Sequence, residues 1–271
     1  MYATDFEYDG RLLSDYGFMI CSFDGTSGAN TIDIGQKLTF NKVSTNKGKY
    51  HSLTGVQYDD CLELSFEIAK NPDVYEDMTI SAEEYRDITR WLNRPTFNKF
   101  RLHSFENEME PCYFEASFNV SKITVGEVLC GLSLDMVTNR PFGFGRERIE
   151  NFDLSDAAKE CELTDCSDEI GYLYPTSLKI VCGEDGDVII SNALTRSRTA
   201  IKNCVAGEEI IFDGRSLSIS TSVPAHDIYN DFNYDYFKIG NTFKTRINEI
   251  TASLPCQIEI KYSPIIKNIP S

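Results

Sequence analysis

The three histidines, which are the residues best suited to exchange protons near neutral pH, are His51, His103 and His226. His51 lies in a polar segment, His103 in an expected strand, and His226 in an expected loop beside Asp227. Zinc sites commonly place two histidines within a few residues of each other, and that spacing is missing here. We therefore expect each histidine to be a surface or structural side chain.

The nine cysteines are the other group that could bind a metal or form disulfides. Their number is odd and their spacing is irregular, which argues against a disulfide framework. Cys161 and Cys166 lack a second pair at zinc-ligand spacing, so we expect no metal. Most are expected to be reduced, buried and inert, because free cysteine packs as a small hydrophobe. The nine are Cys21, Cys61, Cys112, Cys130, Cys161, Cys166, Cys182, Cys204 and Cys256.

Acidic residues offer two further kinds of chemistry. Glu184, Asp185 and Asp187 could bind calcium through carboxylate oxygens, but Gly183–Gly186 lies between two expected strands and favours a hairpin turn. The neighbours Glu83–Glu84 and Glu208–Glu209 could serve glycoside hydrolysis. Such neighbours arise by chance in a chain with 42 acidic residues.

Recognisable catalytic motifs are also missing. The sequence contains no Gly-x-Ser-x-Gly elbow, phosphate loop or dinucleotide fingerprint. We therefore expect no catalytic residue, no ligand site and no cofactor, and we expect that the protein is not an enzyme. A hydrolase is the weakest of the alternatives.

Composition limits the kind of partner. The 271 residues carry a net charge of −16, without a dense Lys/Arg cluster, whereas a protein that grips nucleic acid needs a basic patch. Met1–Asp5 lacks a signal peptide's basic and apolar regions. No stretch approaches the roughly 18 apolar residues that span a membrane. We expect no membrane partner and a protein that starts in a cytoplasm.

The pattern of apolar residues predicts mainly β structure with one helix. Apolar and polar residues alternate over 62–68, 112–120 and 130–136, which indicates strands with one wet face. Ser81 and Glu84 form a capping box, and Asn93-Arg94-Pro95 ends the helix. The candidate structural-helix or subunit-interface residues are Tyr85, Ile88, Trp91 and Leu92 on one helix face, and Phe100 and Leu102 on the next strand.

A Pro/Gly-rich segment, Asn139–Gly145, is the expected domain boundary. We predict a first domain over residues 1–145, a linker or insertion over 146–170, and a second domain over 171–271. Short strands separated by Gly, Asp and Asn turns in the last part indicate a β-sandwich.

The order of these elements resembles the distal tail protein (Dit) or phage tail component family of siphophages. The opening strand Phe6–Gly10 followed by Asp15-Tyr16-Gly17 is similar to the family's start, and the Trp91-Leu92 helix with the Phe100–Leu102 hairpin resembles its belt region. Arg140-Pro141-Phe142 resembles the exit from its first domain. Similar matches in the second half are Tyr174-Pro175, Asn203–Asp213, Phe237–Thr242 and Ile258–Tyr262.

The resemblance implies a structural hub. It implies an N-terminal β-sandwich with one helix and a protruding hairpin (belt), which assembles a homohexameric ring, and a C-terminal galectin-like β-sandwich outside it. The ring would join the tail tube protein to tail-associated or baseplate proteins at the virion tail tip, after assembly in the bacterial host cytoplasm. DNA would pass through an acidic lumen without specific binding. The alternative is a carbohydrate-binding adhesion module that acts through the C-terminal sandwich.

Overall fold

The structure, a computed structural model, describes residues 3–23, 38–45, 48–58, 61–104, 112–155 and 160–267. The chain forms two compact units, the first being Met1–Phe144 with Lys267–Ser271 and the second Gly145–Ile266. Strands dominate both units, so the mainly β fold class is confirmed.

The first unit is built on one antiparallel sheet in the strand order β2-β1-β7-β8-β9-β6-β3. β1 contacts β3 although the two strands are far apart in that order, so the sheet curves back on itself. The rings of Phe6, Phe66 and Phe118 meet inside this curve at centroid distances of 5.6 to 6.1 Å. The strands are β1 (Ala3–Tyr8), β2 (Arg11–Leu12), β3 (Phe18–Cys21), β6 (Glu63–Lys70), β7 (Asn98–Ser104), β8 (Phe114–Val125) and β9 (Val128–Thr138). The unit also contains a 3-10 turn (η1, Leu13–Tyr16) and a short strand, β10 (Gly143–Phe144).

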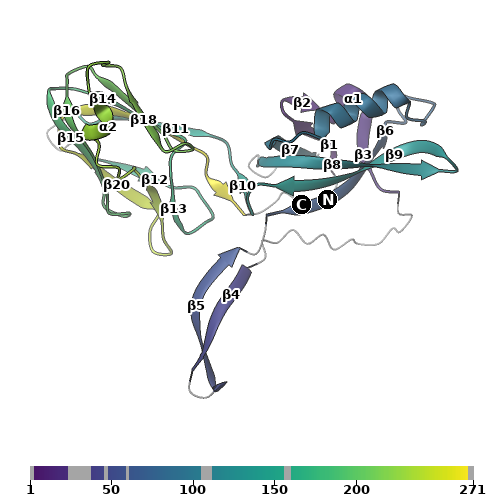
Figure 1. Ribbon diagram of the computed structural model, residues 1–271, viewed down its shortest axis with the longest axis horizontal. Helices are drawn as coiled ribbons and strands as arrows, with labels where there is room; N and C mark the ends of the chain where they lie inside the picture. The colour runs from purple at the N-terminus through teal and green to yellow at the C-terminus, as the bar shows by residue number, and fades with distance from the viewer. Residues whose placement is uncertain are drawn as a thin grey trace. The chain divides into compact units, whose positions relative to one another are not determined.

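Helix α1 (Ala82–Leu92) lies along one face of this sheet (Figure 1). The predicted capping box is present, since the Glu84 N–H donates to the Ser81 hydroxyl and the Ser81 N–H donates to the Glu84 carboxylate. The helix is amphipathic and buries only the face that carries Ile88, Trp91 and Leu92. Burial of that apolar stripe, rather than helix propensity alone, stabilises a helix this short.

A hairpin stands apart from the seven-stranded sheet. β4 (Leu38–Thr45) and β5 (Tyr50–Tyr58) pair only with each other among the described strands (Figure 1). The hairpin expected after the helix is also present, since β7, which carries Phe100–Leu102, pairs antiparallel with β8, and both of its strands lie within the seven-stranded sheet.

The second unit is a two-sheet sandwich. Its larger sheet has the order β11-β21-β14-β17-β18, its smaller sheet β12-β20-β15-β16, and β13 pairs with β19. Apolar side chains from the larger and the smaller sheet pack together in one core, which is typical of β-sandwiches. The strands are β11 (Arg148–Asp153), β12 (Glu160–Thr164), β13 (Gly171–Leu173), β14 (Ser177–Cys182), β15 (Gly186–Asn192), β16 (Ser197–Cys204), β17 (Glu209–Asp213), β18 (Ser218–Thr221), β19 (Ile239–Asn241), β20 (Ile247–Ala252), β21 (Cys256–Tyr262) and β22 (Ile265–Ile266), with a short helix, α2 (Ile228–Asp231).

Two stretches of this unit differ from a simple reading of the sequence. Residues 146–170, expected as linker or insertion, hold β11 and β12, which pair with β21 and β20. Gly183–Gly186 is not a hairpin turn, because β14 and β15 belong to different sheets. The chain crosses from one layer of the sandwich to the other at this point.

Candidate functional site

One face of the β4–β5 hairpin is apolar and uncovered by other described residues. Residues directly opposite each other in antiparallel strands project to the same face, and Leu38 faces Tyr58 while Phe40 faces Val56. Phe40 is 50% exposed and Val56 is 46% exposed. Only Tyr58, at the base, is partly covered, with its ring 6.1 Å from that of Phe142. These residues, together with Leu53, are called the apolar face below.

A β-bulge places Leu53 on the apolar face. The pairing shifts between Asn41 and Lys42, so that Asn41 faces Gly55 and Lys42 faces Leu53, leaving Thr54 without a cross-strand partner. In an unbroken register Leu53 would face Val43 and project to the opposite side. The bulge is held by the Thr54 hydroxyl, which donates to the Asn41 carbonyl at 3.0 Å.

The opposite face of the hairpin is mostly polar. It carries Val43 and Tyr50 near the tip as its large apolar side chains. The remaining members of this face are Thr39, Asn41, Thr45, Ser52, Gly55 and Gln57. The hairpin is therefore amphipathic across its two faces, which is what a strand pair lying on another surface requires.

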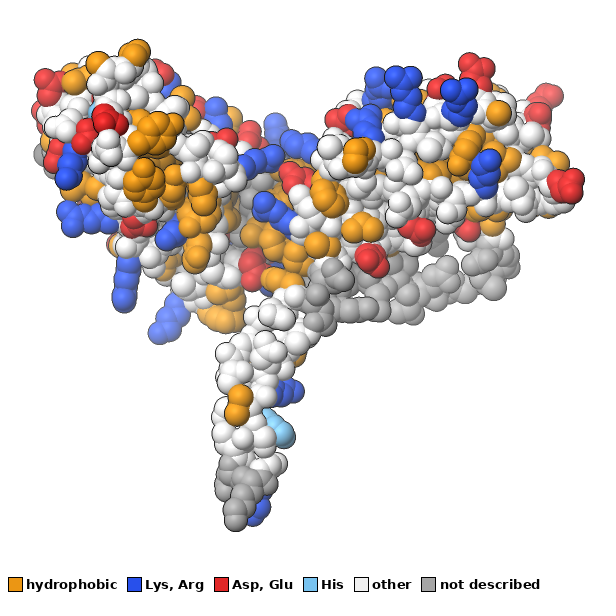
Figure 2. Space-filling view, viewed as in Figure 1, with side chains coloured by type: hydrophobic (Ala, Val, Ile, Leu, Met, Phe, Trp, Pro, Cys, Tyr) orange, Lys and Arg blue, Asp and Glu red, His pale blue; other side chains and the backbone are white. Residues whose placement is uncertain are grey.

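The charge of the hairpin differs in sign from that of the chain. Residues 38–58 contain Lys42, Lys47 and Lys49 and no Asp or Glu, while the whole chain has a net charge of −16. Figure 2 shows blue side chains and no red ones on the visible face of this segment. An apolar, basic hairpin is suited to an apolar and acidic partner surface.

The helix residues expected as structural or interface candidates lie mostly in the core of the first unit. Ile88, Trp91, Leu92 and Phe100 are buried. Trp91 stacks on Phe6 and on Tyr16, at centroid distances of 5.7 Å and 4.6 Å, and its indole N–H donates to the Tyr8 carbonyl at 3.1 Å. These positions anchor α1 to the sheet and present little surface to another subunit.

Tyr85 and Leu102 differ from the other four because they are only partly buried. The ammonium group of Lys122 lies 4.3 Å from the centre of the Tyr85 ring, a cation–π contact between α1 and β8. Leu102 lies opposite Phe6 in the β1–β7 pairing. The six residues do not form one continuous site.

An enclosed cluster of titratable side chains surrounds His226 in the second unit. Its Nδ1 lies 2.5 Å from Glu208 Oε1 and its Nε2 3.3 Å from Asp231 Oδ2. The side chains of His226 and Glu208 are 4% and 0% exposed. Glu208 also accepts hydrogen bonds from the Val205 N–H at 3.0 Å and from the Thr221 hydroxyl.

The charges of this cluster reinforce each other. Burial by itself would raise the pKa of Glu208, but hydrogen bonds from Thr221 and His226 outweigh it and hold the pKa below its usual range. Burial opposes the charged ring of His226, yet the bond and charge of Glu208 outweigh that effect and raise its pKa. Because both ring nitrogens face carboxylates, neither is directed at a nucleophile, and the arrangement ties α2 to the loop before β17 structurally.

Neither the His226–Glu208 contact nor the different surroundings of Glu208 and Glu209 could be inferred from the sequence. The two glutamates are consecutive, but Glu208 lies buried in the loop before β17, whereas Glu209 begins that strand and pairs with Lys179 at 2.9 Å. Glu84, likewise, pairs with Lys70 at 2.9 Å. Neither acidic pair faces a shared substrate position.

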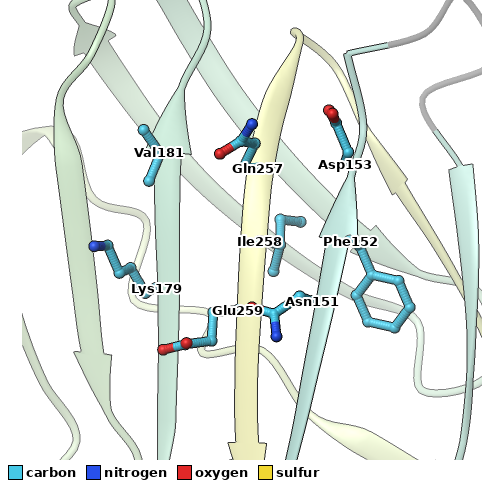
Figure 3. A pocket seen from close by; sticks show the side chains of 8 residues that line it. All are labelled: Asn151, Phe152, Asp153, Lys179, Val181, Gln257, Ile258 and Glu259. Carbon is cyan, nitrogen blue, oxygen red and sulfur yellow. The ribbon is translucent and has the colours of Figure 1, made fainter.

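Two surface depressions lie on the outer faces of the sandwich. The first, over β11, β21 and β14, has a mixed lining (Figure 3). Lys179 faces Glu259, which faces Asn151 on the next strand, and the apolar members are Phe152, Val181 and Ile258. The second has a volume of about 800 Å³ on the smaller sheet and is lined by charged and small residues, among them Glu162, Arg198 and Glu249. The aromatic residue in the lining of the first depression, Phe152, is partly buried and packs against the core of the sandwich, and the lining of the second contains no aromatic residue.

The expectation that most cysteines are buried is wrong. Four are buried, namely Cys112, Cys182, Cys204 and Cys256, whereas the other five are partly exposed. Within the described ranges, no three His, Cys, Asp or Glu side chains are arranged to hold a metal ion. In the same part of the chain, no helix is both long and apolar enough to cross a membrane.

Comparisons with known proteins agree on the kind of protein. No curated protein matches the chain. A crystal structure of the SPP1 Dit (gp 19.1) protein, described as a paradigm of hub adsorption apparatus in Gram-positive infecting phages, has the same fold. The TM-score is 0.66 at 12% sequence identity, and the match covers 96% of this chain and 98% of that one.

Two family models account for nearly the whole sequence. Residues 142–262 match a phage tail C-terminal domain, and residues 1–140 match a phage tail protein N-terminal domain. The resemblance inferred from the sequence motifs is thereby confirmed, and since the N-terminal match alone spans more than half of the 271 residues, the chain belongs to this family of phage tail proteins and is a structural component of the virion tail.

Proposed function

We propose that this tail protein is a distal tail hub, a homohexameric ring that joins the tail tube protein to the tail-tip or baseplate proteins. The fold shared with SPP1 Dit supports this assignment. In this proposal residues 1–145 form the ring and residues 171–271 form a galectin-like domain outside it. The protein assembles in the host cytoplasm and has no catalytic role.

The observation that carries the proposal is the amphipathic β4–β5 hairpin. An apolar face that is exposed in the single chain usually marks a site where another protein surface binds. In a closed ring, each subunit contacts its two neighbours through two different surfaces. A projecting element of each copy can therefore lie on the next copy around the whole ring. The apolar face, with Phe40 and Val56 at its centre, would lie on the neighbouring copy.

Charge supports a second copy as the occupant. The hairpin's lysines meet a chain whose remaining residues are strongly acidic, so opposite charges would meet at each junction of the ring. The same acidity suits a channel through which DNA passes, because phosphates are repelled rather than held. A carbohydrate-binding module is not favoured, since the aromatic residue that lines one depression, Phe152, packs against the core and the other depression has no aromatic residue.

The test compares two double variants of the hairpin by size-exclusion chromatography with light scattering and by native mass spectrometry. Phe40→Ser with Val56→Ser removes two facing residues from the apolar face. Val43→Ser with Tyr50→Ser removes residues of the opposite face that are at least as exposed, at 52% and 65% against 50% for Phe40 and 46% for Val56. We expect hexamers for the wild type and for the Val43/Tyr50 double variant, and monomers or dimers for the Phe40/Val56 double variant.

Circular dichroism shows whether each variant retains the wild-type fold. Hexamers that persist in the Phe40/Val56 variant would refute the role of the apolar face. A wild-type protein that stays monomeric at tens of micromolar, alone and with its tail tube partner, would refute the hub itself.

A further inference from the structure

Two adjoining depressions run along the exposed face of α1 in the first unit. One has a volume of about 570 Å³ and is lined by helix residues within the range 83–93. The other has a volume of about 480 Å³ and lies where the last turn of the helix meets Arg11 of β2 and Tyr16 of η1. Asp87 and Arg90 line both depressions, so the two form one continuous hollow, called the α1 groove below.

Four arginines line the α1 groove. Arg86 and Arg90 lie one turn apart on the exposed side of the helix, and Arg94 follows the helix end. Arg11 is distant in the sequence but lines the same hollow. Figure 2 shows blue side chains gathered over this helix. The fold therefore builds a basic cluster on a chain whose net charge is −16.

Two of the four arginines are held in place by neighbouring side chains. Arg94 pairs with Asp9, with 2.6 Å between Arg94 Nη1 and Asp9 Oδ2. The Nη1 of Arg11 donates a hydrogen bond to the Tyr16 hydroxyl at 3.0 Å. A guanidinium group carries five N–H donors, so each of these contacts fixes the position of an arginine and uses only part of its hydrogen-bonding capacity.

Arg86 and Arg90 lack such contacts. Within the part of the chain that the structure describes, neither side chain takes part in an ion pair or a hydrogen bond. The helix dipole favours Arg90, which lies in the last turn, but does not favour Arg86. Their charges also repel each other, because side chains four residues apart are neighbours on a helix. Two adjacent cations without an ion-pair partner are suited to an anionic ligand.

We propose that the α1 groove binds an extended acidic segment of a partner protein. The proposal does not depend on the hub assignment. The planar fork of arginine pairs with a carboxylate through two parallel hydrogen bonds. The 11 residues of α1 extend over about 16 Å, which matches roughly five residues of an extended chain. The strongest position for a carboxylate is the end where Arg11, Arg90 and Arg94 are opposed by one acid, Asp87.

The acids of the groove favour a peptide over a nucleic acid. Glu83 and Asp87 lie among the arginines and would repel part of a strand that carries a phosphate at every position. A peptide can instead place its carboxylates beside the arginines and neutral side chains beside the two acids. The ligand is therefore a segment whose acidic residues are concentrated at one end.

Trp91 provides a reporter at the proposed carboxylate position. Its ring lines the same end of the groove and stacks on Tyr16 at a centroid distance of 4.6 Å. It is the only tryptophan of the chain. A carboxylate that binds Arg11 would alter the contact between Arg11 and Tyr16, and the emission of Trp91 should change with it.

The test titrates the full-length protein with an acetylated and amidated hexapeptide of three glutamates followed by three serines, using Trp91 fluorescence and isothermal titration calorimetry. We expect saturable binding of one peptide per chain, weakened by salt, and no binding when glutamine replaces glutamate. Arg11→Gln and Arg90→Gln should each weaken binding by roughly fivefold. Arg246→Gln, which changes an exposed arginine of the second unit, is the matched control and should bind like the wild type.

Four outcomes would overturn the proposal. The first is the absence of saturable binding by the wild type, and the second is an equal loss of affinity in Arg246→Gln, which would point to net charge alone. The third is tighter binding of a single-stranded DNA of six thymidines, which would assign the groove to nucleic acid. The fourth is loss of the wild-type oligomeric state in Arg90→Gln with the circular dichroism spectrum unchanged, which would assign the groove to a second copy of this chain.

Discussion

The indole N–H of Trp91 donates a hydrogen bond to the carbonyl oxygen of Tyr8 at 3.1 Å. This bond joins the last turn of α1 to the end of β1, and both side chains also meet through their rings at a centroid distance of 6.0 Å. Trp91 is the only tryptophan of the chain. Its environment therefore reports on the folding of the first unit alone.

Replacing Trp91 should destabilise the first unit strongly. Trp91→Ala removes a large buried side chain and is expected to cost about 3–5 kcal/mol, while Trp91→Phe keeps most of the volume, loses the bond to Tyr8 and should cost about 1–3 kcal/mol. Urea titrations followed by circular dichroism would measure both. Tyr85→Ala, at the partly buried position on the same helix, should change stability by about 1 kcal/mol or less.

The capping box of α1 has unequal halves. Ser81→Ala removes one cap bond and should cost about 1 kcal/mol. Glu84→Gln should cost more, because Glu84 also pairs with the buried ammonium group of Lys70 at 2.9 Å and its loss leaves that charge without its partner. Equal losses in urea titrations of the two variants would show that the Lys70 pair contributes nothing beyond the cap.

Elements whose burial follows the polarity of their residues could be predicted from the sequence. The helix begins at its capping box, and the strands around Leu64, Phe118, Leu134 and Ile258 alternate visibly. β20 could not be predicted, because one of its inward positions is the amide Asn248, which breaks the apolar alternation. The hairpin's isolation and the His226–Glu208 contact depend on distant partners, for which single-chain periodicity holds no signal.

Asn248 joins separate segments of the second unit through its buried amide. Its Oδ1 accepts from Asn192 at 2.8 Å and from the Gly240 N–H at 2.7 Å, and its Nδ2 donates to the Leu163 carbonyl at 3.2 Å. Asn248→Leu should therefore cost several kcal/mol, about 1–3 for each buried group left without a partner. Calorimetry should show the loss in the second unit while the Trp91 fluorescence transition stays in place.

The basic hairpin should make assembly depend on salt. Lys42→Glu with Lys49→Glu reverses the local charge and is expected to weaken association at least tenfold at low ionic strength, because like charges then meet at the proposed junction. Wild-type association should weaken as salt screens the attraction. Lys244→Glu, a charge reversal on an exposed turn of the second unit, is the control, and an equal effect there would point to net charge rather than to the hairpin.

The His226–Glu208 pair should make stability of the second unit depend on pH in both directions. The raised pKa of His226 contributes stability that is complete below its unfolded value, about 6.5, and is lost as pH rises through the folded pKa. The lowered pKa of Glu208 contributes stability that is complete above its unfolded value, about 4.3, and is lost as pH falls through the folded pKa. Both contributions are present together between roughly pH 5 and 6.5.

His226→Gln keeps a hydrogen-bonding side chain of similar size and removes the titration. The melting temperature of the second unit should therefore exceed that of the variant most between about pH 5 and 6.5, with a smaller difference at pH 9 and at pH 3. His51→Gln, in the exposed β4–β5 hairpin, is the matched control and should follow the wild-type profile. A difference between His226→Gln and the wild type that stays constant from pH 4 to pH 9 would show that His226 acts only through packing, because loss of the ion pair must vary with the charge of its members.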